Sequence, residues 1–523
     1  MRVTAETGRD LWRARVETTP ERTFLHSDGR SWTFGEFDLA VRRLAGGLEA
    51  LGVAAGDPVL VGMGNRHETL LSQLAITELG AVFVPLLPGL GFAELSYPID
   101  HSEARLLLAD PETAVPLLPR LDELERLERV VVTADVEVPA GVTATSFEEL
   151  AASEPREPRA PAGYGERSLA AVLYTSGSTG RPKGVMMPAG CFASVGEAFS
   201  LRFGIGSEDV FLFAASFAHA VGSVTALSIT LFNGGRLQIV DRFSPSRFWD
   251  QVAAQGATFS ILFPAHLNLL LETAEGAPGP GEHTFRLVIA HAHDKRFVER
   301  FGTEIATVWG MTETGALCVG SEPGYDGGLG ANYVGTPMKG VEIGVFDDLM
   351  EPVPRGERGE IALRHKDVML GYLKDPEATA ATLVDGWVRS GDHGVLDQEG
   401  RLFFVGRIKN VIKRSGENVS AEEVEEAIEA QAGVVESTVF GVPDRLRTEE
   451  VFAVVVVSAG HTLDPAELRA ACAENLVRWK LPRYLVLTDA PLPRLANGKL
   501  DRVALRRSLD LEAAWDAEAS SAP

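Results

Sequence analysis

The sequence predicts an α/β fold: a large N-terminal domain of several subdomains, with mixed and parallel sheets packed by helices, followed by a small α+β C-terminal domain. Residues 57–110 alternate short apolar runs with helix-like stretches such as residues 67–79, as βαβ units do. The same alternation returns over residues 235–290. At 523 residues, of which 45% are hydrophobic, the chain is long enough for two or three domains.

Short apolar runs mark the expected strands of the N-terminal domain. They lie at residues 59–63, 81–85, 105–109, 169–174, 185–187, 235–240, 258–263 and 285–290. Because helix-like stretches separate most of these runs, we expect parallel strands joined by helices. The Pro- and Gly-rich residues 153–166 indicate a linker before one of the strands.

The C-terminal part has a different character. Ser420 can cap a helix over residues 420–430, whose first turn carries two glutamates, and strand-like runs follow at residues 435–442 and 451–457. This pattern indicates a small α+β domain. Residues 510–523 are acidic and rich in alanine, which predicts a frayed tail.

The strongest motif, YTSGSTGRPKGV at residues 174–185, lies where an apolar run ends. Its glycines let backbone N–H groups approach an anion, its hydroxyls add donors, and its lysine adds fixed positive charge. It is not a Walker A loop, because Pro182 precedes Lys183 and Gly184 follows it. A surface linker is the alternative, which the apolar runs on both sides disfavour. We therefore expect a phosphate-binding loop.

A second motif, WGMTETG at residues 309–315, brings an aromatic ring, a hydroxyl and a carboxylate within five residues. These groups suit an adenine face, a phosphate oxygen and a Mg²⁺ ion. Such a short motif could equally be part of a core. Its position downstream of the phosphate loop favours the functional interpretation.

Two further strings add charge. WVRSGDHG at residues 387–394 precedes a segment at residues 406–425 whose basic side chains stand out in an acidic chain, which favours a bound anion. PLPRLANGKLDR carries Lys499 after an expected Asn-Gly turn. One positive charge about 4 Å from a phosphate contributes about 4 kcal/mol at an effective dielectric constant near 20.

Together these strings resemble those of the adenylate-forming superfamily of acyl-CoA synthetases, carrier-protein adenylation domains and luciferases. The resemblance implies that Trp309 replaces the usual adenine-stacking tyrosine, that Thr312 contacts the α-phosphate or the new acyl-phosphate oxygen, and that Glu313 binds Mg²⁺. It also implies that Lys499 bridges the attacking carboxylate and the α-phosphate. Lys499, Thr312, Glu313 and His219 are then the expected catalytic residues.

The resemblance also implies a set of ATP contacts, in which Asp392 accepts hydrogen bonds from the ribose hydroxyls and Arg407 reaches the ribose or the phosphates. The expected ATP-binding residues are Thr175, Ser176, Gly177, Ser178, Thr179, Gly180, Lys183, Ala290, His291, Ala292, Trp309, Gly310, Met311, Thr312, Asp392, Arg407 and Lys499.

Members of this superfamily move a small C-terminal domain between two half-reactions. The resemblance implies an N-terminal domain at residues 1–408, a mobile C-terminal domain at residues 409–510 and a flexible acidic tail at residues 511–523. Lys409 occupies the place of the hinge residue. The motion would bring Lys499 in for phosphoryl chemistry and take it out before a thiol enters.

The acid-binding pocket is expected around SFAHAVGS at residues 216–223, with His219 as the gate beside the carboxylate. By resemblance the pocket is lined by Phe217, His219, Val221, Val224, His291, His293 and Gly315. A lone histidine more often packs in a core or lies on the surface, so the family match alone makes His219 a candidate.

The sequence departs from the family at LVIAHAHDK, residues 287–295. Ala290, His291 and Ala292 stand where relatives have a glycine-rich turn, and His293 follows. If the segment is extended, the two imidazoles point the same way and could bind a metal, hydrogen-bond a polar substrate or shorten the pocket. We expect a shortened or polar pocket, and hence a small or polar-substituted acid.

The resemblance implies attack of a carboxylate on ATP to give an acyl-AMP and pyrophosphate, with transfer to coenzyme A. Strings at residues 416–420 and 444–450 are similar to those of the carnitine/crotonobetaine-CoA ligase group. One alternative is transfer to a carrier-protein thiol or an amine, including nitrite activation for diazo formation on an aryl amine. Another is a catalytically inactive nucleotide-binding module.

Composition excludes several partners. The net charge of −24 disfavours nucleic acid. Cys191, Cys318 and Cys472 are widely spaced, which predicts buried thiols in a reduced cytoplasm rather than disulfides. The polar N-terminus and the lack of a long apolar run predict a soluble enzyme with no membrane partner. The oligomeric state stays open, a homodimer included.

Overall fold

The computed structural model describes residues 5–134, 136–137, 144–175, 182–322, 324–330, 332–407, 411–414, 417–444, 447–473, 475–476, 478–495, 500–508, 510–511 and 513–519. The chain forms two compact units. Unit 1 comprises Met1–Ile343 and Ala362–Arg389, and unit 2 comprises Gly344–Ile361 and Ser390–Pro523. None of the helices in the described ranges has the length and hydropathy needed to cross a membrane.

Unit 1 contains a sheet, here called sheet I, with the strand order β19-β9-β8-β4-β3-β5-β6-β7. From β8 to β7 neighbouring strands run parallel, as the βαβ pattern predicts, whereas β9 and β19 are antiparallel additions. The strands are β3 (Pro58–Gly62), β4 (Val82–Pro85), β5 (Leu106–Ala109), β6 (Arg129–Val132), β7 (Ala144–Ser146), β8 (Leu169–Thr175), β9 (Lys183–Pro188) and β19 (Gly371–Tyr372).

A second sheet of unit 1, sheet II, has the order β16-β15-β14-β13-β12-β10-β11-β1-β2. It is parallel from β14 to β1 and antiparallel at both ends. The strands are β1 (Thr23–Ser27), β2 (Arg30–Thr33), β10 (Val210–Phe213), β11 (Arg236–Ile239), β12 (Phe259–Ile261), β13 (Leu287–Ala290), β14 (Glu304–Gly310), β15 (Cys318–Gly320) and β16 (Tyr333–Pro337); β20 (Leu383–Val384) pairs with β21.

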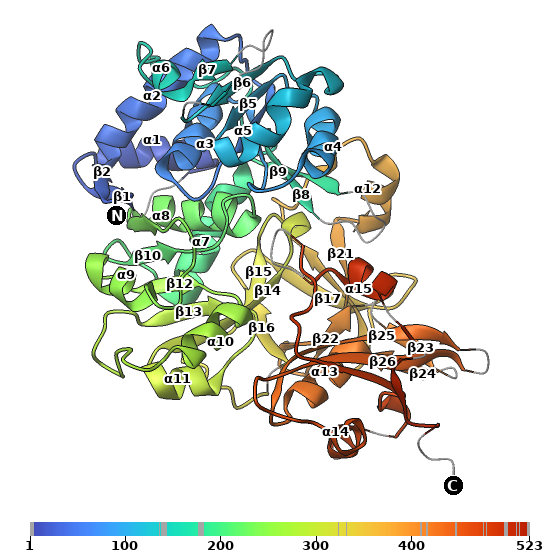
Figure 1. Cartoon of the computed structure of the whole chain (residues 1–523). Helices are drawn as coiled ribbons and strands as arrows, with labels where there is room; N and C mark the ends of the chain where they lie inside the picture. The colour runs from blue at the N-terminus through green and yellow to red at the C-terminus, as the bar shows by residue number, and fades with distance from the viewer. Residues whose placement is uncertain are drawn as a thin grey trace. The chain divides into compact units, whose positions relative to one another are not determined.

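Helices cover both sheets, and Figure 1 shows α7 and α8 in green between them. Helix α3 is buried on nearly every side, as expected for a helix between two layers. The helices are α1 (Gly8–Thr18), α2 (Phe34–Ala50), α3 (His67–Leu79), α4 (Phe92–Ser102), α5 (Pro111–Leu117), η1 (Leu118–Glu123), α6 (Phe147–Ala151), α7 (Gly190–Phe203), the π-helix η2 (Val221–Ala226), α8 (Leu227–Asn233), α9 (Phe248–Gln255), α10 (Pro264–Glu272), α11 (Lys295–Phe301), η3 (Thr312–Thr314) and α12 (Pro376–Thr382).

The carboxyl ends of the parallel strands define where a ligand can bind, because open α/β sheets bind ligands at that edge. In sheet I this edge carries Asn65 after β3 and Thr175 at the end of β8. In sheet II it carries Ala215 after β10, His291 after β13 and Met311 after β14. The predicted motifs of unit 1 therefore gather at the ligand-binding edges of its two sheets.

Unit 2 contains two sheets, with the orders β17-β18-β21-β22 and β24-β23-β26-β27-β28, and β25 pairs with β26. Along the chain, β17, β18 and β21 cross the boundary between the units. The elements are β17 (Glu342–Phe346), β18 (Arg358–Arg364), β21 (Trp387–Leu396), β22 (Leu402–Arg407), β23 (Val411–Arg414), β24 (Glu417–Ser420), α13 (Ala421–Glu429), β25 (Val434–Asp444), β26 (Thr448–Val457), α14 (Pro465–Cys472), η5 (Arg478–Lys480), β27 (Tyr484–Thr488), α15 (Arg502–Ser508) and β28 (Trp515–Asp516).

The structure differs from the sequence predictions at two points of unit 2. Ser420 precedes α13, but its hydroxyl bonds to Val405 O at 3.1 Å and to Glu422 Oε2 at 3.0 Å instead of capping the helix. The tail is not frayed at Trp515–Asp516, because β28 pairs with β27 there. The adjacent Glu518 accepts a bond from Arg447 at 2.6 Å. Charge pairing of this kind was not visible in the local composition.

Candidate active site

The predicted phosphate loop connects two antiparallel strands. Thr175 at the end of β8 pairs with Lys183 at the start of β9, and Tyr174 pairs with Gly184. Strands β8 and β9 with their connecting loop are called the phosphate hairpin below. The loop thus differs from a Walker A loop, which leads from a strand into a helix. Five of its predicted residues lie outside the described residues: Ser176, Gly177, Ser178, Thr179 and Gly180.

The base of the phosphate hairpin is fixed on both sides. The Tyr174 hydroxyl donates to Pro98 O at 3.2 Å and lies 3.0 Å from His101 Nδ1. A Cβ atom at Gly184 would lie 2.9 Å from Val172 Cγ1, so the hairpin packs too closely there for any side chain. These contacts hold the ends of the loop at the carboxyl edge of sheet I.

Lys183 and Glu313, which are 130 residues apart by their numbers, meet through a tyrosine. Lys183 Nζ lies 4.8 Å from the centre of the Tyr372 ring. The Tyr372 hydroxyl donates to Glu313 Oε1 at 2.9 Å. Tyr372 is buried, and burial followed by the charge of Glu313 raises the pKa of its hydroxyl, which therefore keeps its proton as a donor.

Glu313 is held by the backbone around it. It lies in the 3₁₀ turn η3, and its carbonyl oxygen accepts from Met369 N at 3.0 Å. Gly315 ends the turn at a φ of +72°, and a Cβ atom there would lie 2.2 Å from Asp367 O. The chain from Asp367 to Tyr372 therefore wraps closely around the turn, which fixes the carboxylate.

The donor set at Glu313 fits Mg²⁺. The side chain is 8% exposed, and a hydrogen bond from Tyr372 orients one of its oxygens. Mg²⁺ in nucleotide enzymes is held by one or two carboxylates together with phosphate oxygens. A single oriented carboxylate, linked through Tyr372 to Lys183 at the base of the phosphate hairpin, meets that requirement.

The remaining residues of the second motif follow β14. Trp309, the penultimate residue of this strand, is 7% exposed and pairs with Val319 of β15. Thr312 begins the η3 turn and is half-buried, as are Gly310 and Met311. Contact of the Trp309 ring with adenine stays a prediction.

The two histidines after β13 contact different neighbours. The His291 ring stacks on Phe263 at 5.9 Å between ring centres, and its Nδ1 lies 3.3 Å from Val308 O. The His293 ring meets the edge of Tyr325 at 5.3 Å, and burial lowers the pKa of His293. The chain bends at residues 291 and 292, so the extended geometry assumed for a shared ligand is absent. Ala290 is buried and Ala292 is half-buried.

The segment predicted to bind the acid follows β10. Phe217 and Val224 are 1% and 0% exposed, so both side chains pack in the core, whereas His219 and Val221 are half-buried. Residues 221–226 form a π-helix, a distortion that is frequent at functional sites. His219 precedes the π-helix, and its carbonyl oxygen accepts from Ser223 N and Ser223 Oγ, both at 3.0 Å.

In unit 2, Asp392 and Arg407 face each other across β21 and β22. Arg407 Nε lies 3.3 Å from Asp392 Oδ1, and the Asp392 side chain is 9% exposed whereas the Arg407 side chain is 66% exposed. The contacts of both residues with ATP stay predictions. Lys409 and Lys499 lie outside the described residues.

Sequence reasoning missed two residues of this region. Tyr372 links Lys183 to Glu313, and Asn65 donates and accepts hydrogen bonds between the two sheets. Neither belongs to a motif with a recognisable spacing. A Gly-Tyr pair that follows an apolar run was the one local signal for Tyr372.

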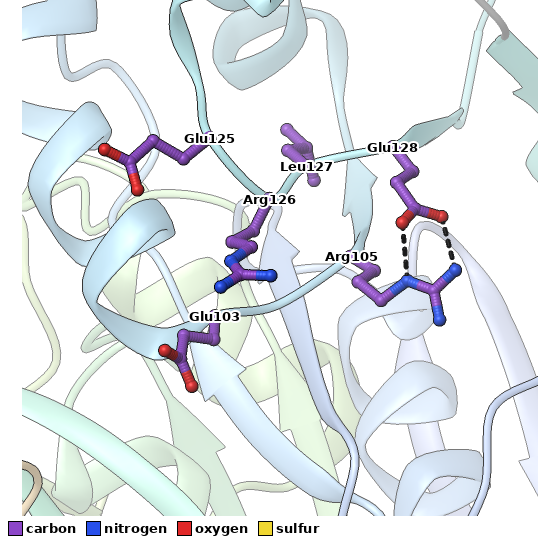
Figure 2. A pocket seen from close by; sticks show the side chains of 6 residues that line it. All are labelled: Glu103, Arg105, Glu125, Arg126, Leu127 and Glu128. Carbon is purple, nitrogen blue, oxygen red and sulfur yellow. Dashed lines mark hydrogen bonds and ion pairs between the residues drawn. The ribbon is translucent and has the colours of Figure 1, made fainter.

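A hollow of about 480 Å³ lies elsewhere in unit 1 (Figure 2). Arg105 and Glu128, joined at 2.6 Å, precede β5 and β6, so the hollow lies at the amino edge of sheet I. It is remote in topology from the phosphate hairpin and mixes both signs of charge. Its lining residues are Glu103, Arg105, Glu125, Arg126, Leu127 and Glu128.

Other reactive groups belong to none of the predicted motifs. Among the described residues, the His, Cys, Asp and Glu side chains close enough to share a metal ion are Asp28, His67 and Glu68. His67 lies 3.1 Å from Glu68 as in an ordinary ion pair, and we assign no metal there. The three cysteines are free and buried, and burial raises the pKa of each thiol.

Comparisons with known proteins agree with this geometry. The family model described as AMP-binding enzyme matches residues 12–373, and the AMP-binding enzyme C-terminal domain matches residues 423–499. A crotonobetaine/carnitine-CoA ligase from Escherichia fergusonii is 30% identical over 518 residues, covering 95% of this chain and 98% of the relative. A sulfoacetate-CoA ligase from Cupriavidus necator is 31% identical over 497 residues, covering 94% and 96%.

Solved structures show the same fold. ATP-bound MatB from Rhodopseudomonas palustris superposes with a TM-score of 0.85 at 29% identity, covering 96% of this chain and 99% of that one. The o-succinylbenzoate CoA synthetase from Bacillus subtilis, in complex with its acyl-adenylate intermediate, gives a TM-score of 0.84 at 26% identity, covering 97% and 99%. The predicted fold class and family are thereby confirmed. The chain belongs to the AMP-binding enzyme family, as an adenylate-forming enzyme of the acyl-CoA ligase type.

Proposed function

We propose that this enzyme activates a small or polar-substituted carboxylic acid with ATP and Mg²⁺, and transfers the acyl group to coenzyme A. The observation that supports this most is the contact of Lys183 and Glu313 through Tyr372. It brings a fixed cation and an oriented carboxylate together at the base of the phosphate hairpin, whose sequence is rich in glycine and hydroxyl groups. Such a set suits the phosphates of a nucleotide.

The reaction needs no nucleophile from the protein. A carboxylate oxygen of the acid forms a bond to the α-phosphorus, while the bond to the pyrophosphate oxygen breaks. The thiol sulfur then bonds to the acyl carbon, the bond from that carbon to the AMP oxygen breaks, and the thiol proton passes to solvent. The buried cysteines, whose thiol pKa values are raised, agree with this scheme.

The chain's own residues then bind and orient the reactants. In this proposal Lys183 and the hairpin loop neutralise the phosphates, and Thr312 contacts the α-phosphate. Asp392 accepts from the ribose hydroxyls, with Arg407 beside it. Glu313 would hold Mg²⁺, which neutralises phosphate charge when bound.

Lys499 and Lys409, which lie outside the described residues, also have roles in this proposal. Lys499 bridges the acid carboxylate and the α-phosphate in the first half-reaction. The domain boundary lies between residues 408 and 409, with Lys409 as the hinge. The compact units of the structure divide at Arg389 and Ser390, and the matched C-terminal domain spans residues 423–499, so the boundary at residue 408 stays a prediction.

Packing beside the predicted pocket supports a short acid. In this proposal four residues at the carboxyl edge of sheet II line the acid pocket: Phe217, His219, Phe263 and His291. His291 stacks on Phe263, whose ring centre lies 5.6 Å from that of His266. His266 in turn stacks on Phe243 at 4.2 Å. In this proposal the row of rings limits the length of the acyl chain that can bind.

The names of the relatives point the same way. Both curated relatives are named for short acids, and carnitine, crotonobetaine and sulfoacetate each carry a second charged group. The acid of this enzyme is therefore expected to be short and to carry a polar or charged substituent.

The test is a panel assay of AMP and pyrophosphate release. Carnitine, crotonobetaine, sulfoacetate, benzoate, anthranilate, o-succinylbenzoate and palmitate are each supplied with ATP and Mg²⁺, with and without coenzyme A. We expect AMP release with a short polar acid, an acyl-CoA product when coenzyme A is present, and no reaction with palmitate. Nitrite with an aryl amine is a further arm. Strict dependence of AMP release on nitrite and the amine would instead establish the alternative acceptor chemistry.

A further inference from the structure

A buried amide, Asn65, joins the ligand-binding edges of the two sheets of unit 1. It lies between β3 of sheet I and helix α3, and is 9% exposed. Its Nδ2 donates to the carbonyl oxygens of Val240, at 3.3 Å, and of Ala215. Its Oδ1 accepts from the backbone N–H of Phe217 at 3.2 Å. Both amide hydrogens and one lone pair are therefore directed at sheet II.

The groups that Asn65 binds lie beside the segment around His219 that is predicted to bind the acid. This segment is called the acid end below. Ala215 and Phe217 lie in the turn that leads from β10 to His219, and Val240 directly follows β11. Within the turn, His219 N donates to Ser216 O at 3.1 Å. A shift of the turn would therefore move the backbone of His219.

A second buried amide holds the far side of the same segment. Gln73 of helix α3 is 1% exposed, and its Nε2 donates to Ser223 O at 2.6 Å. Ser223 lies in the π-helix, and its hydroxyl donates to His219 O at 3.0 Å. The two amides thus hold residues 217 and 223, on either side of His219.

The backbones of the turn and the π-helix are in close contact. A Cβ atom at Gly222 would lie 2.6 Å from Ser216 O and 2.7 Å from Phe217 Cα. No side chain fits between the two segments. A displacement at Phe217 is therefore passed to the π-helix without a flexible side chain that could absorb it.

We propose that Asn65, with Gln73 as a second support, is a positioning residue that sets the distance between the acid and the nucleotide. The inference rests on the proposed function. The phosphate hairpin belongs to sheet I and His219 follows a strand of sheet II, so the amide fixes the spacing between the bound phosphate and the bound acid. Carboxylate attack on phosphorus is sensitive to such spacing, since a small misplacement of reacting atoms lowers the rate strongly.

The first test needs no substrate. Hydrogen exchange is measured on peptides covering residues 214–227 and on peptides covering β8 and β9, in the wild type and in Asn65→Ala. We expect exchange in residues 214–227 to be faster by about tenfold, because three anchoring bonds are lost, and exchange in β8 and β9 to be unchanged. Unchanged exchange in residues 214–227 would overturn the anchoring role.

Asn233→Ala is the matched control for this test. The Asn233 amide donates to Ser200 Oγ at 2.6 Å and to Ile229 O at 3.1 Å, at the end of helix α8. The substitution removes two amide bonds from a site that holds neither the turn nor the phosphate hairpin. We expect it to leave exchange in residues 214–220 unchanged.

The second test is kinetic, with the acid that gives most AMP in the panel assay. In Asn65→Asp, which keeps the shape but replaces two donors with an acceptor, we expect kcat to fall by about tenfold or more because the bound reactants are misplaced. We expect KM for the acid to rise and KM for ATP to stay within about twofold. Asn233→Ala should change none of these values. Equal changes in the two KM values, or no change, would reduce Asn65 to a purely structural role.

The outcomes separate the inference from the proposed function. If the wild type releases AMP with no acid, the proposed function fails, while hydrogen exchange still decides the anchoring role. If Asn65 variants do not fold, Gln73→Met removes the single bond to Ser223 and is tested in the same two assays. Gln73→Met with wild-type exchange and wild-type KM for the acid would then overturn the inference.

Discussion

The nucleotide end of unit 1, around Lys183 and Glu313, and the acid end, around His219, both lie at carboxyl edges of parallel strands. They differ in the kinds of residue that form them. At the phosphate hairpin, two charged side chains from separate motifs, Lys183 and Glu313, meet through the Tyr372 ring and hydroxyl. At the acid end, uncharged amides hold backbone groups and aromatic rings stack on one another.

The difference follows from what each end binds. The two solved relatives hold ATP or an acyl-adenylate, and phosphate groups favour charged partners whose residue types show in the sequence. The acid differs among relatives, and the shape of its pocket depends on how a turn is held. Substitutions at the nucleotide end should therefore lower the rate of acid activation. Substitutions at the acid end should alter the affinity for the acid or the local stability.

Glu313→Gln should have the largest effect, because it removes the carboxylate charge that Mg²⁺ needs while keeping the size of the side chain. We expect the rate of pyrophosphate release to fall on the order of a hundredfold or more. Glu78→Gln is the control, since Glu78 is 2% exposed, pairs with Arg9 and Arg13, and belongs to none of the predicted motifs. That variant should lower Tm and keep its turnover. A Glu313→Gln enzyme with wild-type turnover would refute the role of Glu313.

Tyr372→Phe should have an intermediate effect. It removes the hydrogen bond to Glu313 and keeps the ring below Lys183, so the Mg²⁺ concentration for half-maximal rate should rise by about tenfold. Tyr333→Phe is a matched control, because Tyr333 donates to Glu322 Oε2 at 2.6 Å in an equivalent pair outside the motifs. The comparison of the two ends is weakened if both variants show the same Mg²⁺ dependence.

His266→Phe should have the smallest effect and should appear as a pH dependence of stability. Burial lowers the pKa of His266 from its ordinary value of 6.5 to about 4, and its Nδ1 accepts from Phe263 N at 3.4 Å. A histidine whose pKa is lower in the folded state stabilises the protein fully above pH 6.5, and this stability is lost as the pH falls toward 4.

Phenylalanine at this position can stack on Phe243 and does not titrate. Tm measured at intervals from about pH 7.5 to about pH 4.5 should therefore fall less steeply in His266→Phe than in the wild type. Parallel curves would show that protonation of His266 does not contribute to the loss of Tm at low pH.

The sequence predicted the scaffold of the site well. The expected strands at residues 59–63, 105–109 and 285–290 correspond to β3, β5 and β13, and the helix expected at residues 67–79 is α3. These elements could be predicted because apolar periodicity over a few residues reflects burial within one strand or helix.

The sequence could not predict how the two histidines after β13 are arranged. Their spacing suggested a shared direction, but the chain bends at residues 291 and 292, and each ring contacts a different aromatic neighbour. The tail showed the same limit. Its acidic composition suggested fraying, yet Glu518 pairs with Arg447, which lies 71 residues earlier in the chain.

By itself the sequence determined the family, the nucleotide chemistry and the order of strands and helices, because charged motifs and short apolar runs are local. The tertiary structure decided which groups connect them. Tyr372 reaches Glu313 across 59 residues, and Asn65 reaches Ala215, Phe217 and Val240 across 150 to 175 residues. Contacts over such separations depend on how two sheets pack against each other, which no local pattern encodes.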